Sequence, residues 1–108
     1  MDSRSLTDLI DELLAETPAG GRAARTVHGG REHALRQTLM VLREGAELGE
    51  HDSPGEATLQ VLRGSVRLSA GADSWVGSAG DHVTIPSARH SLASLEDSAV
   101  LLSVVVSA

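Results

Sequence analysis

Histidines are the side chains of this protein best suited to chemistry, because the sequence contains five of them and no cysteine. The lack of cysteine excludes disulfides, thiolate nucleophiles and thiolate metal ligands. His51 is followed by Asp52 and, across a Ser-Pro-Gly turn, by Glu56, so a histidine–carboxylate pair for acid–base catalysis is one interpretation. Such a pair must lie within hydrogen-bond reach. Adjacent residues of a strand point to opposite faces, so the spacing does not favour it.

Ser53 is close enough to His51 in the sequence to suggest an activated serine. A hydrolase serine, however, occupies a sharp connection between a strand and a helix, and no helical pattern follows residue 53. A hydroxyl directly before Pro54 more often caps a turn. Three other histidines lie in polar turns and are expected on the surface: His28, His33 and His82.

Short β-strands are predicted from residue 22 to the C-terminus, with turns rich in glycine, proline and polar residues between them. They are expected over residues 23–28, 34–42, 46–51, 57–62, from 66 onward, and over 74–77, 83–85, 91–95 and 99–106. This pattern is typical of an all-β barrel or sandwich. We therefore divide the chain into an N-terminal helix and linker (residues 1–21) and a β-barrel (residues 22–108). Trp75, the one aromatic residue of the sequence, is expected to pack in the barrel or at a subunit interface.

An amphipathic helix is predicted before the first strand. Ser5 is placed to cap it, with Asp8 three residues later, and the segment 17–21 ends it. The apolar residues recur at helical spacing: Leu6, Leu9, Ile10, Leu13 and Leu14. The polar face is acidic rather than basic, which favours packing on the barrel or on a second subunit over binding to a membrane surface.

Composition limits the class of partner. The net charge is −6 and the basic residues are spread along the chain, which argues against nucleic-acid binding. No apolar run has the length of a signal peptide or a membrane span, so we expect a cytoplasmic protein without a membrane partner. A chain of 108 residues buries a modest core, so we expect a homodimer.

Two segments resemble the motifs of the cupins, a family of small β-barrels. The first cupin motif is glycine, five residues, histidine, and later a closing glycine; Gly45, His51 and Gly64 match its spacing. The second is glycine, five residues, proline, and later a histidine; Gly80 and Pro86 match it, and His90 lies one residue before the expected place. The resemblance covers roughly residues 35–106 and implies a jelly-roll barrel, a double-stranded β-helix.

The same resemblance implies a metal site from which ligands are missing. In metal-binding cupins, three histidines and a glutamate converge inside the barrel. Here His51 and His90 occupy two of these places, while Ser53 and Ala57 occupy the other two. Glu56 sits beside the glutamate place, but a shift of one residue along a strand sends a side chain to the opposite face.

The candidate pocket residues are therefore His51, Ser53, Ala57 and His90, and His51 and His90 are the candidate metal ligands. Gln37, Gln60 or His33 are candidates to reach in from a neighbouring strand. A first-row metal usually needs three or four good ligands, so the expected cofactor is either none or a divalent metal ion.

Three functions remain open from the sequence. The first is a small-molecule-binding protein whose metal site has been lost. The second is a metal-dependent enzyme of the isomerase or dioxygenase type with an unusual ligand set. The third is a structural or interaction module whose barrel is filled by its own side chains.

Overall fold

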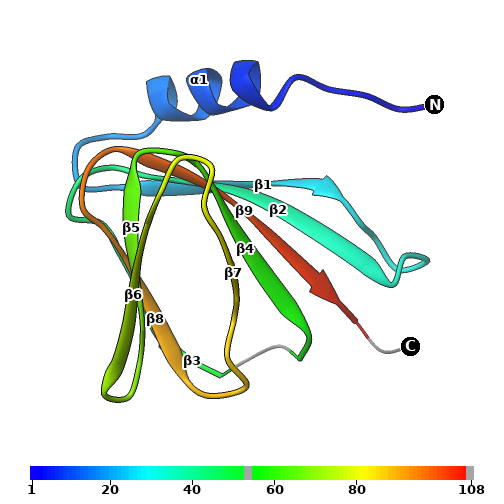
Figure 1. Cartoon of the computed structure of the whole chain (residues 1–108). Coiled ribbons are helices and arrows are strands. Elements are labelled where there is room, and N and C mark those ends of the chain that lie inside the picture. Colours follow the sequence, from blue (N-terminus) through cyan, green and yellow to red (C-terminus); the bar gives the residue numbers. More distant parts are fainter. Residues whose placement is uncertain (53–54, 107–108) are drawn as a thin grey trace.

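The computed structural model describes residues 1–52 and 55–106, and in these ranges it contains one helix followed by nine strands (Figure 1). The helix α1 spans Leu6–Glu16. The strands are β1 (Arg22–His28), β2 (Leu35–Leu42), β3 (Glu47–His51), β4 (Ala57–Arg63), β5 (Ser65–Ala70), β6 (Asp73–Ser78), β7 (His82–Thr84), β8 (His90–Ser94) and β9 (Ser98–Val105).

The strands form two antiparallel sheets that close into the predicted jelly-roll barrel. One sheet has the order β1-β2-β9-β4-β7 and the other the order β3-β8-β5-β6. Strands that are distant in the sequence therefore become neighbours, as when β9 pairs along its length with both β2 and β4. Within the described residues, no helix is long and apolar enough to cross a lipid bilayer.

Alternation along the strands places one apolar set between the two sheets. On β4, Ala57, Leu59 and Val61 are buried in this main core, while Gln60 is exposed. Trp75 packs against the same core. Its ring lies over Gly77, where a Cβ atom would come within 2.1 Å of the indole, so this glycine leaves room for the ring.

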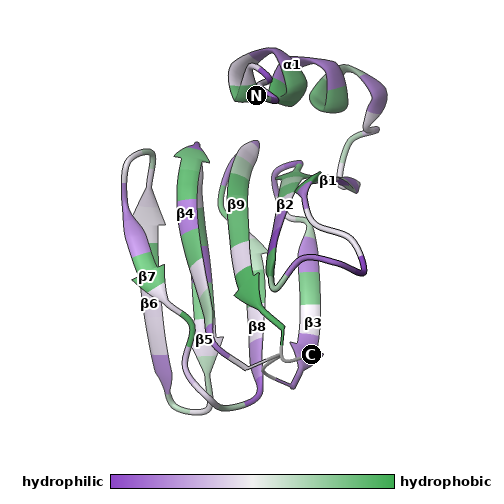
Figure 2. Ribbon diagram, turned by 90° about the vertical axis from the view of Figure 1, so that its right-hand side faces the viewer, coloured by the Kyte–Doolittle hydropathy of each residue, from purple (hydrophilic) through white to green (hydrophobic). Residues whose placement is uncertain are grey.

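A second apolar cluster lies on the outer face of the five-stranded sheet, under α1. Leu9, Ile10 and Leu13 of the helix pack with Leu39 and Ala99 of β2 and β9. Figure 2 shows the hydrophobic residues of α1 on the side turned toward the strands and polar residues on the opposite side. The predicted helix cap is confirmed, because the Ser5 hydroxyl accepts a hydrogen bond from the backbone N–H of Asp8 at 3.1 Å.

Arg43 ties the end of α1 to the barrel. Its Nε donates to the carbonyl of Thr17 at 3.0 Å, and its Nη2 donates to the carbonyl of Leu14. Its Nη1 pairs with Asp97 Oδ2 at 2.9 Å, while Asp97 Oδ1 accepts from the backbone N–H of Glu44 at 2.8 Å. The Glu44 N–H and the Arg43 guanidinium hold the pKa of the Asp97 carboxyl below its ordinary value of 3.8.

Because the pKa of Asp97 is lowered in the folded state, its ionised carboxylate stabilises the fold at pH values above the ordinary pKa of 3.8. This contribution is lost as the pH falls through the pKa that Asp97 has in the folded state. We therefore expect Asp97→Asn to melt at a lower temperature than the wild type between about pH 5 and 7, with the gap narrowing below about pH 4. Thermal unfolding followed by circular dichroism measures this gap. Asp73→Asn, at an exposed hairpin position, is the control; a gap for Asp97→Asn that does not change with pH would contradict the assignment.

Candidate functional site

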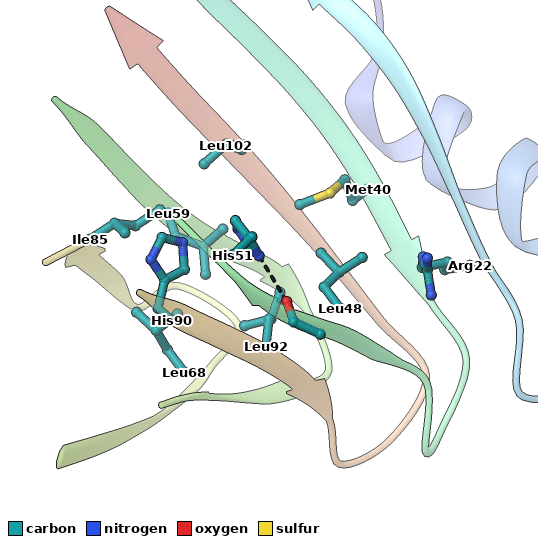
Figure 3. Close-up of a pocket in the computed structure, with 11 residues that line it drawn as sticks. Arg22, Met40, Leu48, His51, Leu59, Leu68, Ile85, His90, Leu92 and Leu102 are labelled. Carbon is teal, nitrogen blue, oxygen red and sulfur yellow. Dashed lines mark hydrogen bonds between the residues drawn. The ribbon is translucent and has the colours of Figure 1, made fainter. Parts of the chain in front are cut away.

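A cavity of about 380 Å³ opens between the two sheets at one end of the barrel (Figure 3). Arg22, Gly49, His51 and His90 contribute to its wall. The rest of the wall consists of apolar side chains from both sheets: Met40, Leu48, Leu59, Leu68, Ile85, Leu92 and Leu102.

His51 and His90 meet in this cavity because their strands pair. They are directly opposite each other in the register of β3 and β8. Their ring centroids are 4.4 Å apart, and the rings meet edge to face at 67°. The convergence implied by the cupin-like motifs is therefore present in the structure, although His90 lies one residue before the position of the motif.

A β-bulge in β3 turns His51 inward. Leu48 is opposite Leu92 and His51 is opposite His90, so three residues along β3 match two along β8. Alternation would otherwise place residues three apart on opposite faces. The extra residue restores the inward direction, as bulges do when they redirect a side chain near a site.

The two histidines differ in their access to solvent. His90 is 3% exposed, whereas His51 is exposed. His51 therefore lies near the surface of the protein, and His90 lies deeper in the wall of the cavity.

Backbone carbonyls determine which ring nitrogen carries the proton in each neutral imidazole. The Nδ1 of His51 is 2.9 Å from the carbonyl oxygen of Gly49, and the Nδ1 of His90 is 2.9 Å from that of Ala88. A carbonyl oxygen only accepts, so both Nδ1 atoms must donate. Both Nε2 atoms are then lone-pair acceptors, and among the described residues neither has a hydrogen-bond partner.

These two acceptors fall short of the metal site that the cupin-like motifs imply. No group of three or more histidine, cysteine, aspartate or glutamate side chains is placed to hold a metal within residues 1–52 and 55–106. Tight first-row metal sites use three or four protein ligands. The described residues therefore do not fit a resident divalent metal.

The structure places the other candidate residues elsewhere. Ala57 is buried in the main core, and Gln60 is exposed on the outer face of β4. Gln37 lies at the outer face near His33, where its Nε2 donates to the Ser103 hydroxyl at 3.1 Å. Ser53 is outside the described residues.

The carboxylates near His51 in the sequence do not join it in the cavity. Asp52 Oδ1 is 3.5 Å from Arg89 Nε in an exposed ion pair, and Glu56 is exposed. His28, His33 and His82 are also exposed, as expected from their turns.

Arg22 is the site residue that sequence reasoning missed. It lies at the start of β1, the edge strand of the five-stranded sheet, and donates through Nη1 to the carbonyl of Glu47 in β3 at 2.8 Å. It thus connects the two sheets at the rim of the cavity. The sequence holds no local pattern that singles out Arg22, because β1 mixes polar and apolar residues.

Comparison with known proteins supports the fold. No protein-family model matches the chain, and no curated protein matches it. A solved structure of a conserved protein of unknown function from Streptococcus pyogenes is 25% identical, with a TM-score of 0.81, over 100% of this chain and 92% of that one.

Two further solved structures carry the family name. A cupin superfamily protein from Desulfitobacterium hafniense has a TM-score of 0.80 at 15% identity, over 99% of this chain and 94% of that one. An RmlC-like cupin from Desulfovibrio desulfuricans has a TM-score of 0.77 at 20% identity, over 97% of this chain and 96% of that one. The chain therefore has the fold of a small, single-domain cupin.

The carbonyl contacts of the two imidazoles predict an unusual tautomer. We expect the neutral imidazoles of His51 and His90 to carry their proton on Nδ1. Long-range ¹H–¹⁵N correlation spectra distinguish the two tautomers, and the exposed His82 serves as an internal reference. A protonated Nε2 on His90 would show that the hydrogen bond to Ala88 is absent.

Proposed function

We propose that this protein binds a small apolar molecule in the barrel cavity and does so without a resident metal. The observation that carries the proposal is a cavity of about 380 Å³ whose wall is mainly aliphatic, with two imidazoles among its polar groups. Ligand pockets in proteins typically have volumes of roughly 300–1,000 Å³ and few, well-placed polar groups.

The two alternatives have less support. A filled structural barrel does not account for the open space beside His51 and His90. A metal-dependent isomerase or dioxygenase would need at least one more ligand, and the described residues place no third acid, histidine or cysteine beside the pair. Metal analysis of the purified protein tests the enzyme alternative: stoichiometric metal that is lost in His51→Ala would favour it over the proposal.

A neutral apolar probe tests the proposal directly. We expect octan-1-ol to bind and to shift the methyl NMR signals of Leu48, Leu92 and Leu102. Leu102→Trp should fill the cavity and weaken binding at least about tenfold, which corresponds to about 1.4 kcal/mol.

Val76→Trp is the matched control, because Val76 is 53% exposed and lies outside the cavity. It should leave octanol binding unchanged. Methyl shifts that are absent in the wild type, or that persist in Leu102→Trp, would contradict binding in the cavity.

We also propose a homodimer in the cytoplasm. Leu35 and Val105 are directly opposite each other on β2 and β9, and they are 42% and 44% exposed on the outer face of the five-stranded sheet. The half-buried Leu101 lies on the same face of β9. Exposed apolar side chains that adjoin in this way are typical of subunit interfaces.

The homodimer proposal predicts a change of mass. Light scattering after size exclusion should give twice the 11.2 kDa mass of the chain for the wild type. Leu35→Glu should give the mass of one chain, because burying a charge at the interface is costly. Val76→Glu, on the other sheet, should remain dimeric. A wild-type protein that is monomeric at all concentrations would overturn this proposal.

A further inference from the structure

The polar side chains of the cavity wall are basic rather than acidic. Among the residues that the structure describes, the wall contains one arginine and two histidines but no aspartate or glutamate side chain, although the chain as a whole carries a net charge of −6. Because a carboxylate in an apolar wall would attract cations, its absence disfavours a cationic ligand.

The two ends of the cavity offer opposite hydrogen-bonding properties. At the histidine end, both Nε2 atoms present lone pairs, because each Nδ1 donates to a carbonyl. At the other end, Arg22 presents only N–H donors and a positive charge. Nη1 of Arg22 is occupied by the Glu47 carbonyl, and within the described part of the chain no other hydrogen bond of its guanidinium is found.

The distance between these ends matches a short chain molecule. Arg22 is hydrogen-bonded to the carbonyl of Glu47, and His51 lies four residues further along β3. At the rise of a strand with one bulge, these four residues separate Glu47 from His51 by about 10–13 Å. The wall between them is aliphatic, including Met40, Leu48 and Leu92 (Figure 3). An apolar chain thus fits between the arginine and the imidazoles.

We infer that the ligand of this cavity is an apolar carboxylic acid, with its carboxylate at Arg22 and its hydrocarbon chain extending toward His90. This inference rests on the proposed binding function and adds the chemical class of the ligand. A carboxylate is the natural partner of a guanidinium fork, whereas the lone pairs of the two imidazoles repel it from the histidine end. Arg22 is exposed, so the charged head remains at the solvent-facing rim while only the chain is desolvated.

Calorimetric titration with three probes of one chain length tests the inference: octanoate, octan-1-ol and octylamine. In the wild type at low salt and about pH 7.5, we expect octanoate to bind at least about fivefold more tightly than octanol, as for a partly exposed charge pair. Octylamine should bind most weakly. The preference for octanoate should fall as salt is raised, because exposed charges are screened.

Variants of Arg22 assign this preference to one side chain. Arg22→Gln should abolish the preference, so that octanoate binds no more tightly than octanol to the same variant, while Arg22→Lys should keep part of the preference. Arg25→Gln, at an exposed position of the same strand that does not line the cavity, should behave like the wild type. Circular dichroism shows independently that each variant is folded.

The failure of this inference is distinguishable from the failure of the binding function. If octanol binds but octanoate does not bind more tightly, or if octylamine binds best, the carboxylate assignment is wrong and the cavity remains a binding site. If none of the three probes binds, the proposed function itself is wrong.

Discussion

The geometry of the site depends on the unequal pairing of β3 and β8. Three residues of β3 span the distance that two residues of β8 span, and this bulge turns His51 into the cavity that His90 already faces. Without it, alternation would direct His51 to the solvent side of the sheet, and the cavity would keep a single imidazole. The carbonyl of Gly49, within the bulge, also holds the His51 ring through Nδ1.

The cavity is a consequence of an aliphatic core. The sequence contains neither phenylalanine nor tyrosine, and its one tryptophan lies over Gly77 and does not line the cavity. Leucine, valine and methionine side chains from two facing sheets therefore have to fill the barrel, and at the β3–β8 end they leave about 380 Å³ open. The helix adds no atoms there, because it covers the outer face.

The sequence was sufficient to predict the fold, because glycines and a proline mark the strand ends at cupin-like intervals and β4 alternates clearly. It also predicted the meeting of His51 and His90. Gln37 was harder, since β2 carries apolar residues on both faces and its alternation does not say which face is inside. Gln60 was wrongly included, because the alternation of β4 already puts it on the face opposite Ala57, Leu59 and Val61. The bulge depends on pairing with β8, and the role of Arg22 depends on its reach to Glu47. The bulge and the contact of Arg22 both depend on the tertiary structure, and no local sequence pattern indicates either of them.

The central claim is an open apolar cavity with two imidazoles in its wall, and a crystal structure of xenon-pressurised crystals tests it most directly, because xenon enters dry apolar cavities. We expect a xenon peak between Met40, Leu48 and Leu92, with the His51 and His90 rings in edge-to-face contact beside it. A barrel closed by these side chains, or the two rings on separate surfaces, would contradict it.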